Sequence, residues 1–205
     1  IKNCEESSKK TSLEPDQKKK DFDQDPVLDR MEIQLKKSGV DTEFTKNLDL
    51  SWATADISRF LKQYTNDEYI LLFPFCSTKN QNKRWPYFKE LISELKKDYK
   101  NKYSILIAPG PKEVEEANKL NGKVVLDNNE PVKIKTLISL INKANFVIAN
   151  DTGPAHIASH LDKIGLVLFG SHTTAKNGGP CPPGFFCARV ATVEAEPCPK
   201  GYYWC

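Results

Sequence analysis

The chain has 205 residues, enough for one well-packed core with additional segments or for two small domains. Charged residues make up 28% of it, with 30 Lys and Arg against 27 Asp and Glu, so the charge does not indicate a nucleic-acid-binding protein. No run of about 18 consecutive apolar residues is present, and no membrane-spanning helix is predicted.

The first part of the chain offers little apolar surface. It opens on polar residues without a signal peptide or an initiator Met, so we expect a fragment of a longer protein. Residues 1–24 are rich in Lys, Glu, Ser and Asp and are predicted to be a flexible charged segment. Residues 26–40 predict a helix that ends at Ser38-Gly39, and residues 48–64 predict a loop that leads into a short helix.

From residue 69 onward, short apolar runs alternate with amphipathic stretches. The expected strands are 69–75, 103–108, 123–126, 145–149 and 164–169. The expected helices between them are 85–99, 112–120, 132–143 and 154–161. This alternation predicts an α/β fold, a Rossmann-like parallel sheet with helices on both faces.

The loops that follow the strands are informative because ligands of such sheets bind beyond the carboxyl ends of the strands. The stretch 150-NDTGP-154 follows one strand and begins a helix. Thr152 or Gly153 can cap that helix, and Gly153 allows close backbone approach, so free N–H groups and the helix dipole form an anion site. We expect Asp151 to orient the turn or accept a sugar hydroxyl, and His156 to donate to a phosphate or a sugar. The alternative is an ordinary helix start with a packed histidine.

Two other strand-end loops carry polar residues of the same kind. Lys83 and Arg84, with the hydroxyls of Ser77 and Thr78, follow the first strand. Such a set suits a diphosphate, although basic residues in loops are often only solvated. Glu113 begins the helix after the second strand, where a carboxylate can accept both ribose hydroxyls or merely complement the helix dipole.

No metal and no cofactor are predicted. His156 and His160 lie four residues apart on one predicted helix, but neither a third ligand nor an HExxH motif accompanies them. The chain also lacks a GxGxxG motif, a Walker lysine loop and a nucleophile elbow. These absences argue against a dehydrogenase, a P-loop protein and a hydrolase.

Three stretches occur together in a specific order and spacing: 70-ILLFPFCSTKNQNKRWPYFKELISEL-95, 107-IAPGPKEVEEA-117 and 149-ANDTGPAHIASHLDKIGLVLFG-170. In these stretches the chain resembles the family-nine glycosyltransferases, the bacterial ADP-heptose:lipopolysaccharide heptosyltransferases. That family has a GT-B fold, in which two Rossmann-like domains face each other across a cleft. The resemblance implies that residues 69–176 are the nucleotide-sugar-binding domain and that residues 25–68 are a remnant of the N-terminal acceptor domain with its linker.

The resemblance also implies roles for particular residues. Lys83 resembles the family's diphosphate-contacting lysine, and Glu113 resembles its ribose-binding glutamate. The implied donor-binding set is Ser77, Thr78, Lys83, Glu113, Asp151, Thr152, Gly153 and His156. The family's catalytic base belongs to the N-terminal domain, which we expect to be missing, so the catalytic residue is unknown.

The activity implied by the resemblance is inverting transfer of a heptose, or a similar sugar, from an ADP-sugar to a lipopolysaccharide core acceptor. Lys83 and the helix amino end would stabilise the leaving diphosphate. The implied partners are the ADP-sugar, with ADP-heptose favoured, and a lipid-linked saccharide, without nucleic acid. The implied location is cytoplasmic, with peripheral contact to the bacterial inner membrane. One departure is Phe75, which stands where the family usually has glycine.

The family pattern is expected to end near Lys176, and residues 177–205 are predicted to be an unrelated Cys-rich tail. Four of the six cysteines lie in it: Cys181, Cys187, Cys198 and Cys205. Their spacing resembles short cysteine-rich repeats of extracellular proteins. Disulfides are favoured over a zinc site, and three pairings of the four cysteines stay open. The preferred explanation of the tail is a joined reading frame. Two other functions stay open, a non-catalytic nucleotide-sugar-binding module and a secreted Cys-rich interaction protein.

Overall fold

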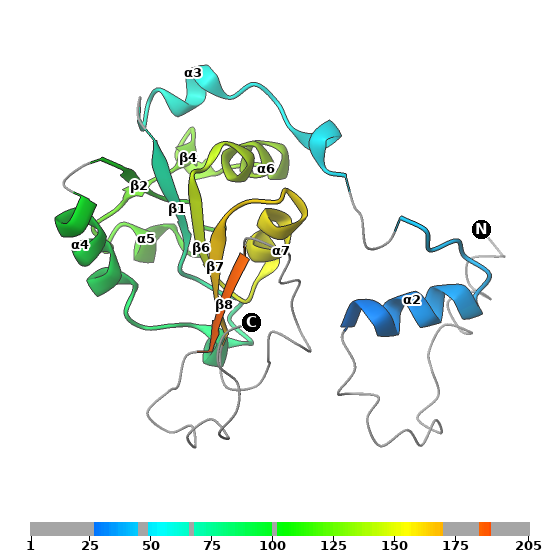
Figure 1. Cartoon of the computed structure of the whole chain (residues 1–205). Coiled ribbons are helices and arrows are strands. Elements are labelled where there is room, and N and C mark those ends of the chain that lie inside the picture. Colours follow the sequence, from blue (N-terminus) through cyan, green and yellow to red (C-terminus); the bar gives the residue numbers. More distant parts are fainter. Residues whose placement is uncertain (1–26, 45–48, 66–67, 100–101, 170–184, 190–205) are drawn as a thin grey trace. The chain divides into compact units, whose positions relative to one another are not determined.

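The computed structural model describes residues 27–44, 49–65, 68–99, 102–169 and 185–189 (Figure 1). The chain forms two units, residues 1–48 with 176–179 and residues 49–175 with 180–205, and each is described by itself. The charged segment 1–24 lies outside the described residues. So do three of the four tail cysteines, so the expected disulfides stay a prediction.

In the first unit, helix α2 (Val27–Lys37) confirms the helix predicted there. It ends through two backbone bonds, from Gly39 N–H to Lys36 O (3.1 Å) and from Val40 N–H to Leu35 O (3.0 Å). Gly39 has φ +74°, the left-handed conformation that this type of helix end requires and that glycine adopts without a steric penalty. The helix therefore ends where Ser38-Gly39 predicted, because Gly39 adopts the backbone conformation that this helix end requires.

The second unit is built on a parallel sheet of six strands in the order β3-β2-β1-β6-β7-β8. The strands are β1 (Tyr69–Phe73), β2 (Ser104–Ile107), β3 (Lys123–Val124), β6 (Phe146–Asn150), β7 (Gly165–Phe169) and β8 (Phe185–Arg189). Leu71 of β1 pairs with Leu106 on one side and with Val147 on the other. The strand order reverses at β1 and β6, and this reversal is where open α/β sheets bind their ligands.

Helices cover both faces of this sheet (Figure 1). Leu71 and Phe73 of β1 belong to a core with α3 (Ser58–Leu61), α6 (Ile134–Lys143) and α7 (Gly153–His160). The alternate residues Ile70 and Leu72 belong to a second core with α4 (Phe88–Tyr99) and α5 (Val114–Ala117). Every residue of β1 is buried because both of its faces are covered, which is why its sequence reads as a continuous apolar run. The predicted fold class is confirmed.

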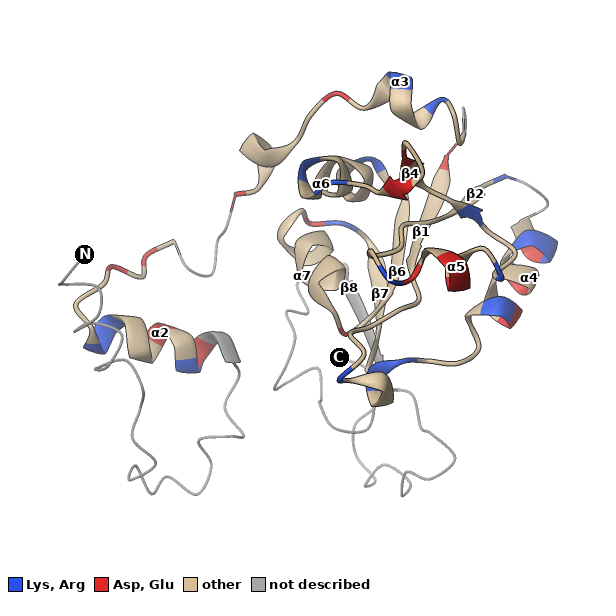
Figure 2. Ribbon diagram, turned by 180° about the vertical axis from the view of Figure 1, so that it is seen from behind, with Lys and Arg blue, Asp and Glu red and all other residues tan. Residues whose placement is uncertain are grey.

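The outer surfaces of the helices carry both signs of charge, as along α4 in Figure 2. Two short 3-10 turns, η2 (Ser51–Ala53) and η3 (Gln81–Lys83), lie in connecting segments. Among the residues that the structure describes, no helix has the length and apolarity needed to cross a membrane.

Two features of the sheet were not predicted. The stretch expected as one strand, 123–126, divides between β3 and the hairpin of β4 (Leu126–Asp127) and β5 (Glu130–Pro131). Asn128 (φ 51°) and Asn129 (φ 66°) form its turn, because asparagine tolerates left-handed backbone better than most residues. Strand β8 comes from the segment 177–205 and pairs with β7 over five residues, so the sheet has six strands instead of the five expected.

Candidate functional site

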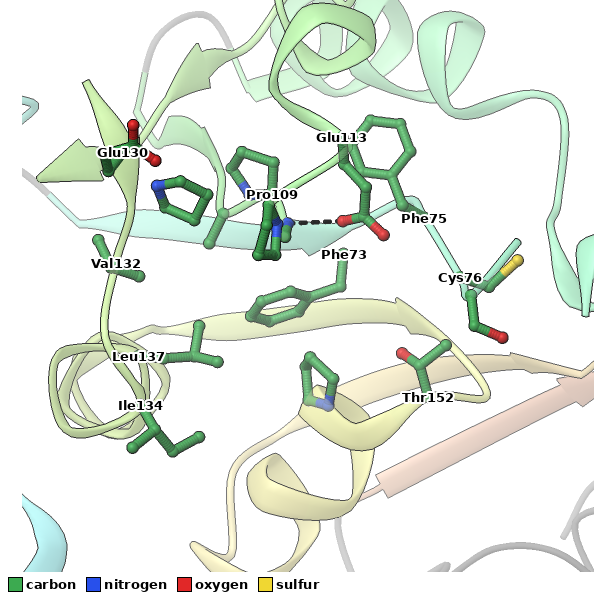
Figure 3. A pocket seen from close by; sticks show the side chains of 16 residues that line it. Phe73, Phe75, Cys76, Pro109, Glu113, Glu130, Val132, Ile134, Leu137 and Thr152 are labelled. Atoms are coloured by element: carbon green, nitrogen blue, oxygen red, sulfur yellow. Dashed lines mark hydrogen bonds between the residues drawn. The ribbon is translucent and has the colours of Figure 1, made fainter. Parts of the chain in front are cut away.

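A cavity of about 520 Å³ opens where β1, β2 and β6 end, beside the reversal of strand order (Figure 3). Figure 3 shows Val132 and Leu137 on one side of it and Glu113 and Thr152 on the other. The complete lining is Phe73, Phe75, Cys76, Ser77, Ala108, Pro109, Gly110, Pro111, Glu113, Glu130, Pro131, Val132, Ile134, Leu137, Thr152 and Pro154. The lining thus combines apolar side chains with the polar side chains of Ser77, Glu113, Glu130 and Thr152.

Lys83 is held by an ion pair next to this cavity. Its Nζ lies 2.7 Å from Asp151 Oδ2 and 3.3 Å from the backbone oxygen of Asp151. The Asp151 side chain is 4% exposed and that of Lys83 is 20% exposed. A buried carboxylate needs a partner, and turn η3 brings Lys83 to it. Lys83 is therefore not a merely solvated loop lysine.

Glu113 points back over its own loop. Its Oε2 accepts a hydrogen bond from the Gly110 N–H at 2.6 Å, drawn as a dashed line in Figure 3. A Cβ on Gly110 would lie 3.0 Å from the same oxygen, so glycine leaves the room that the carboxylate occupies. One carboxylate oxygen thus fixes the loop while the side chain lines the cavity.

The amino end of α7 has no side-chain cap. Thr152 occupies the N-cap position, but its Oγ1 donates to Asn150 O at 3.2 Å instead of accepting from the helix. Of the two predicted caps, Thr152 or Gly153, the structure has Thr152 at the N-cap position, with its hydroxyl turned toward the preceding strand. Gly153 has open space where a Cβ would stand, which leaves its backbone approachable.

Arg84 is also paired. Its Nη1 donates to Glu116 Oε2 at 2.9 Å, and a second bond joins Nη2 to Oε1. The guanidinium lies 5.1 Å from the centre of the Phe75 ring. The hydrogen bonds from Arg84 lower the pKa of Glu116, and the same bonds raise the pKa of Arg84. Phe75, the departure from the family pattern, is thus a buried wall of the cavity backed by an ion pair.

The structure brings most of the predicted residues to one edge of the sheet. Ser77, Glu113 and Thr152 line the cavity, and the Lys83–Asp151 pair lies at the peptide before Thr152. The others are not cavity-lining. Thr78 and Gly153 are exposed, and His156 Nε2 stands 3.8 Å from Asp151 Oδ1.

Two residues near the site were not predicted. Cys76 lines the cavity, its Sγ donates to Asn80 O at 3.1 Å, and burial raises the pKa of its thiol. Asn150 bonds to two segments of the loop after β1. The sequence did contain a signal for Asn150, because it is a polar residue at the end of an otherwise apolar strand. A polar side chain buried at such a position needs hydrogen-bond partners. Among the described residues, no group of three or more His, Cys, Asp or Glu is placed to hold a metal ion.

The pKa of His156 is lowered, chiefly by burial, while Asp151 opposes that effect. A histidine with a depressed folded-state pKa favours the folded protein when it is neutral, so stability is lost as pH falls below about 6.5. We expect His156→Gln to flatten the decrease in the free energy of unfolding between pH 7 and 5. His160→Gln removes only a smaller cause of the lowered pKa, so in urea titrations across this range it should change the slope less than His156→Gln does. An unchanged pH slope in His156→Gln would contradict the assignment.

The fold and the cavity define a doubly wound α/β domain with a ligand site at the reversal of its strand order. The sequence profile of glycosyltransferase family 9 (heptosyltransferase) matches residues 5–200, and the chain belongs to this family. The match continues beyond Lys176, where the resemblance was expected to end, and includes β8. No curated protein matches the chain.

Three solved structures of glycosyltransferases have folds similar to that of this chain. The glycosyltransferase of family 9 from Veillonella parvula DSM 2008 has a TM-score of 0.61 at 19% identity and covers 83% of this chain and 51% of its own. E. coli heptosyltransferase WaaC with ADP has a TM-score of 0.56 at 23% identity, and the match covers 79% of this chain and 49% of WaaC. E. coli ADP-heptose lps heptosyltransferase II has a TM-score of 0.53 at 20% identity, and the match covers 67% of this chain and 44% of that enzyme. The chain therefore spans about half the length of these structures, and at such identities the likeness establishes the fold.

Proposed function

We propose that this chain is the donor-binding half of a family 9 glycosyltransferase and that its cavity binds an ADP-sugar, with ADP-heptose as the donor. One observation carries the proposal. Ser77, Glu113 and Thr152 come from three separate strand-end loops and line the same cavity. Loops far apart in sequence that place a hydroxyl, a carboxylate and an uncapped helix end around one space make a site for a sugar nucleotide.

The two ends of the cavity suit the two ends of a nucleotide. Val132, Ile134 and Leu137 supply an apolar surface for a nucleobase (Figure 3). Glu113 lies on the other side, where the carboxylate oxygen that Gly110 does not occupy can accept a ribose hydroxyl. ADP is the nucleotide in the similar WaaC structure, which supports ADP over UDP here.

The diphosphate would lie toward the amino end of α7. There the Ser77 hydroxyl, the approachable backbone of Gly153 and the dipole of α7 all favour negative charge. Lys83 is next to this position but is bound to Asp151. A bound diphosphate would share the Lys83 ammonium, and the Asp151 carboxylate would then be available to accept a hydroxyl of the sugar.

The proposed reaction is glycosyl transfer with inversion. The acceptor hydroxyl forms a bond to the anomeric carbon while the bond from that carbon to the diphosphate oxygen breaks. Lys83 and α7 stabilise the charge that grows on the leaving ADP. A base of the acceptor domain takes the hydroxyl proton. We assign residues 69–176 to donor binding and 25–68 to the remnant of the acceptor domain. We also propose that the acceptor is a lipopolysaccharide core saccharide and that the protein contacts the bacterial inner membrane peripherally.

A thermal-unfolding panel tests the donor. ADP-heptose, ADP, UDP-glucose and GDP-mannose are each added to the full chain at equal concentration. A ligand that binds only the folded chain adds about 2.7 kcal/mol at a hundredfold excess over its Kd, so we expect a rise of several degrees in Tm for the adenine nucleotides. Equal Tm values across the panel would overturn the proposal. Donor binding without transfer, when an acceptor domain is supplied, would leave the non-catalytic binding module.

A further inference from the structure

Asn150 joins the donor loop to the sheet through both ends of its side chain. It is the last residue of β6 and is completely buried, with 0% exposure. Its Nδ2 donates to Pro74 O at 2.9 Å, and its Oδ1 accepts from the Trp85 N–H at 3.1 Å. Pro74 begins the loop that follows β1 and Trp85 ends it, so one amide group ties the two ends of this loop together.

Backbone hydrogen bonds shape the loop between these two ends. They run from Asn80 N–H to Ser77 O (2.9 Å) and from Lys83 N–H to Asn80 O (3.0 Å). These turns connect the tied ends of the loop to Lys83, so the position of Lys83 depends on where the ends are held. Lys83 lies only two residues before Trp85, and Asn150 directly precedes Asp151, the partner of Lys83.

We propose that Asn150 is a positioning residue of the donor site: its amide clamps loop 74–85 onto the end of β6 and thereby sets Lys83 beside α7. This inference rests on the proposed function of the cavity. Asn150 does not line that cavity, so its effect on a ligand passes through Lys83 and Ser77. Without the amide, the buried Pro74 carbonyl and the partly buried Trp85 N–H lose their partner, which favours loop conformations that satisfy them elsewhere.

The same strand offers a matched control. Asn145 precedes β6 at its other end, and its exposed side chain also makes one bond through its oxygen and one through its nitrogen toward β1 and the residue before it. Its Oδ1 accepts from the Tyr69 N–H at 3.0 Å, and its Nδ2 donates to Glu68 Oε1 at 3.1 Å. Asn145 lies at the amino end of the strand, away from the cavity. Asn145→Ala therefore removes two side-chain bonds of an asparagine next to the same strand without touching loop 74–85.

The test compares ADP with adenosine in isothermal titration of the full chain and its variants. We expect Asn150→Ala to raise the Kd for ADP about tenfold, the cost of roughly one hydrogen-bonded contact. The Kd for adenosine should stay within about twofold of the wild-type value, because adenosine has no phosphate for Lys83 to contact. Asn145→Ala should leave both constants unchanged. Equal losses for both ligands, or equal effects of both substitutions, would overturn the positioning role.

Amide hydrogen exchange of the ligand-free protein separates this inference from the proposed function. Faster exchange in 76–84 in Asn150→Ala, and not in Asn145→Ala, supports the clamp even if wild type binds no nucleotide, which would refute the proposed function alone. Unchanged exchange in that loop refutes the clamp whatever ADP does. If Asn150→Ala does not fold, Asn150→Asp keeps an oxygen that can accept from the Trp85 N–H but has no amide donor for Pro74 O, and it should show the same changes in the exchange of the loop.

Discussion

Replacing Lys83 with alanine is expected to weaken ADP binding by one to two orders of magnitude, because a hydrogen bond to a charged group contributes about 1.5–3 kcal/mol. The ligand-free protein should also lose about 2–3 kcal/mol of stability, since the buried Asp151 carboxylate would be left without its 2.7 Å partner. Titration calorimetry and urea unfolding measure the two effects separately. Lys79→Ala, an exposed lysine of the same loop, should change neither quantity.

A double substitution decides what the lysine does. In Lys83→Ala with Asp151→Asn, the buried carboxylate charge that lost the Lys83 ammonium is gone, so most of the lost stability should return. Affinity for ADP should stay low, because the cation that meets the diphosphate is still missing. If ADP affinity returned with stability, Lys83 would be only the structural partner of Asp151.

The second large effect is expected at Glu113. Glu113→Ala should raise the Kd for ADP roughly 10- to 100-fold, because the carboxylate that accepts the ribose hydroxyls is lost. The loss should nearly vanish when 2′,3′-dideoxy-ADP replaces ADP, since that ligand has no hydroxyls to donate. Glu115→Ala is the matched control on the same helix, with a side chain that is 91% exposed.

Glu113→Gln distinguishes binding from loop support. The amide oxygen of glutamine can still accept the Gly110 N–H bond, which measures 2.6 Å in the present structure. Loop support should therefore survive, while binding of ribose weakens because the acceptor is no longer charged. A glutamine variant that bound ADP as tightly as wild type would show that Glu113 serves only its own loop.

The order of strands and helices could be predicted because each apolar run was short and bounded by turn residues. Tyr69–Phe73 is buried on both faces and reads as an unbroken apolar stretch, whereas α4 shows its amphipathic spacing plainly. Strand β8 was hidden because Phe185–Arg189 lies among cysteines and prolines that suggested a separate module. The position of β8 depends on its pairing with β7, and local sequence patterns do not predict such a long-range contact.

The candidate site was predictable in its location but not in its internal bonds. Parallel strands end at one edge, so residues after β1, β2 and β6 had to be neighbours. The pairing of Lys83 with Asp151 could not be predicted, because it depends on how turn η3 folds back. The same holds for the Arg84–Glu116 pair, whose members are 32 residues apart in sequence. Which neighbours touch is decided by packing and by the need to satisfy buried charge.

The position of β8 also affects biosynthesis. The strand pairs with β7 from Gly165 to Phe169. During translation, the hydrogen-bonding edge of β7 therefore stays open until residues 185–189 have been added to the chain. Unpaired edges invite association between nascent chains, so the interval between the synthesis of β7 and of β8 is the period in which this sheet is exposed to aggregation.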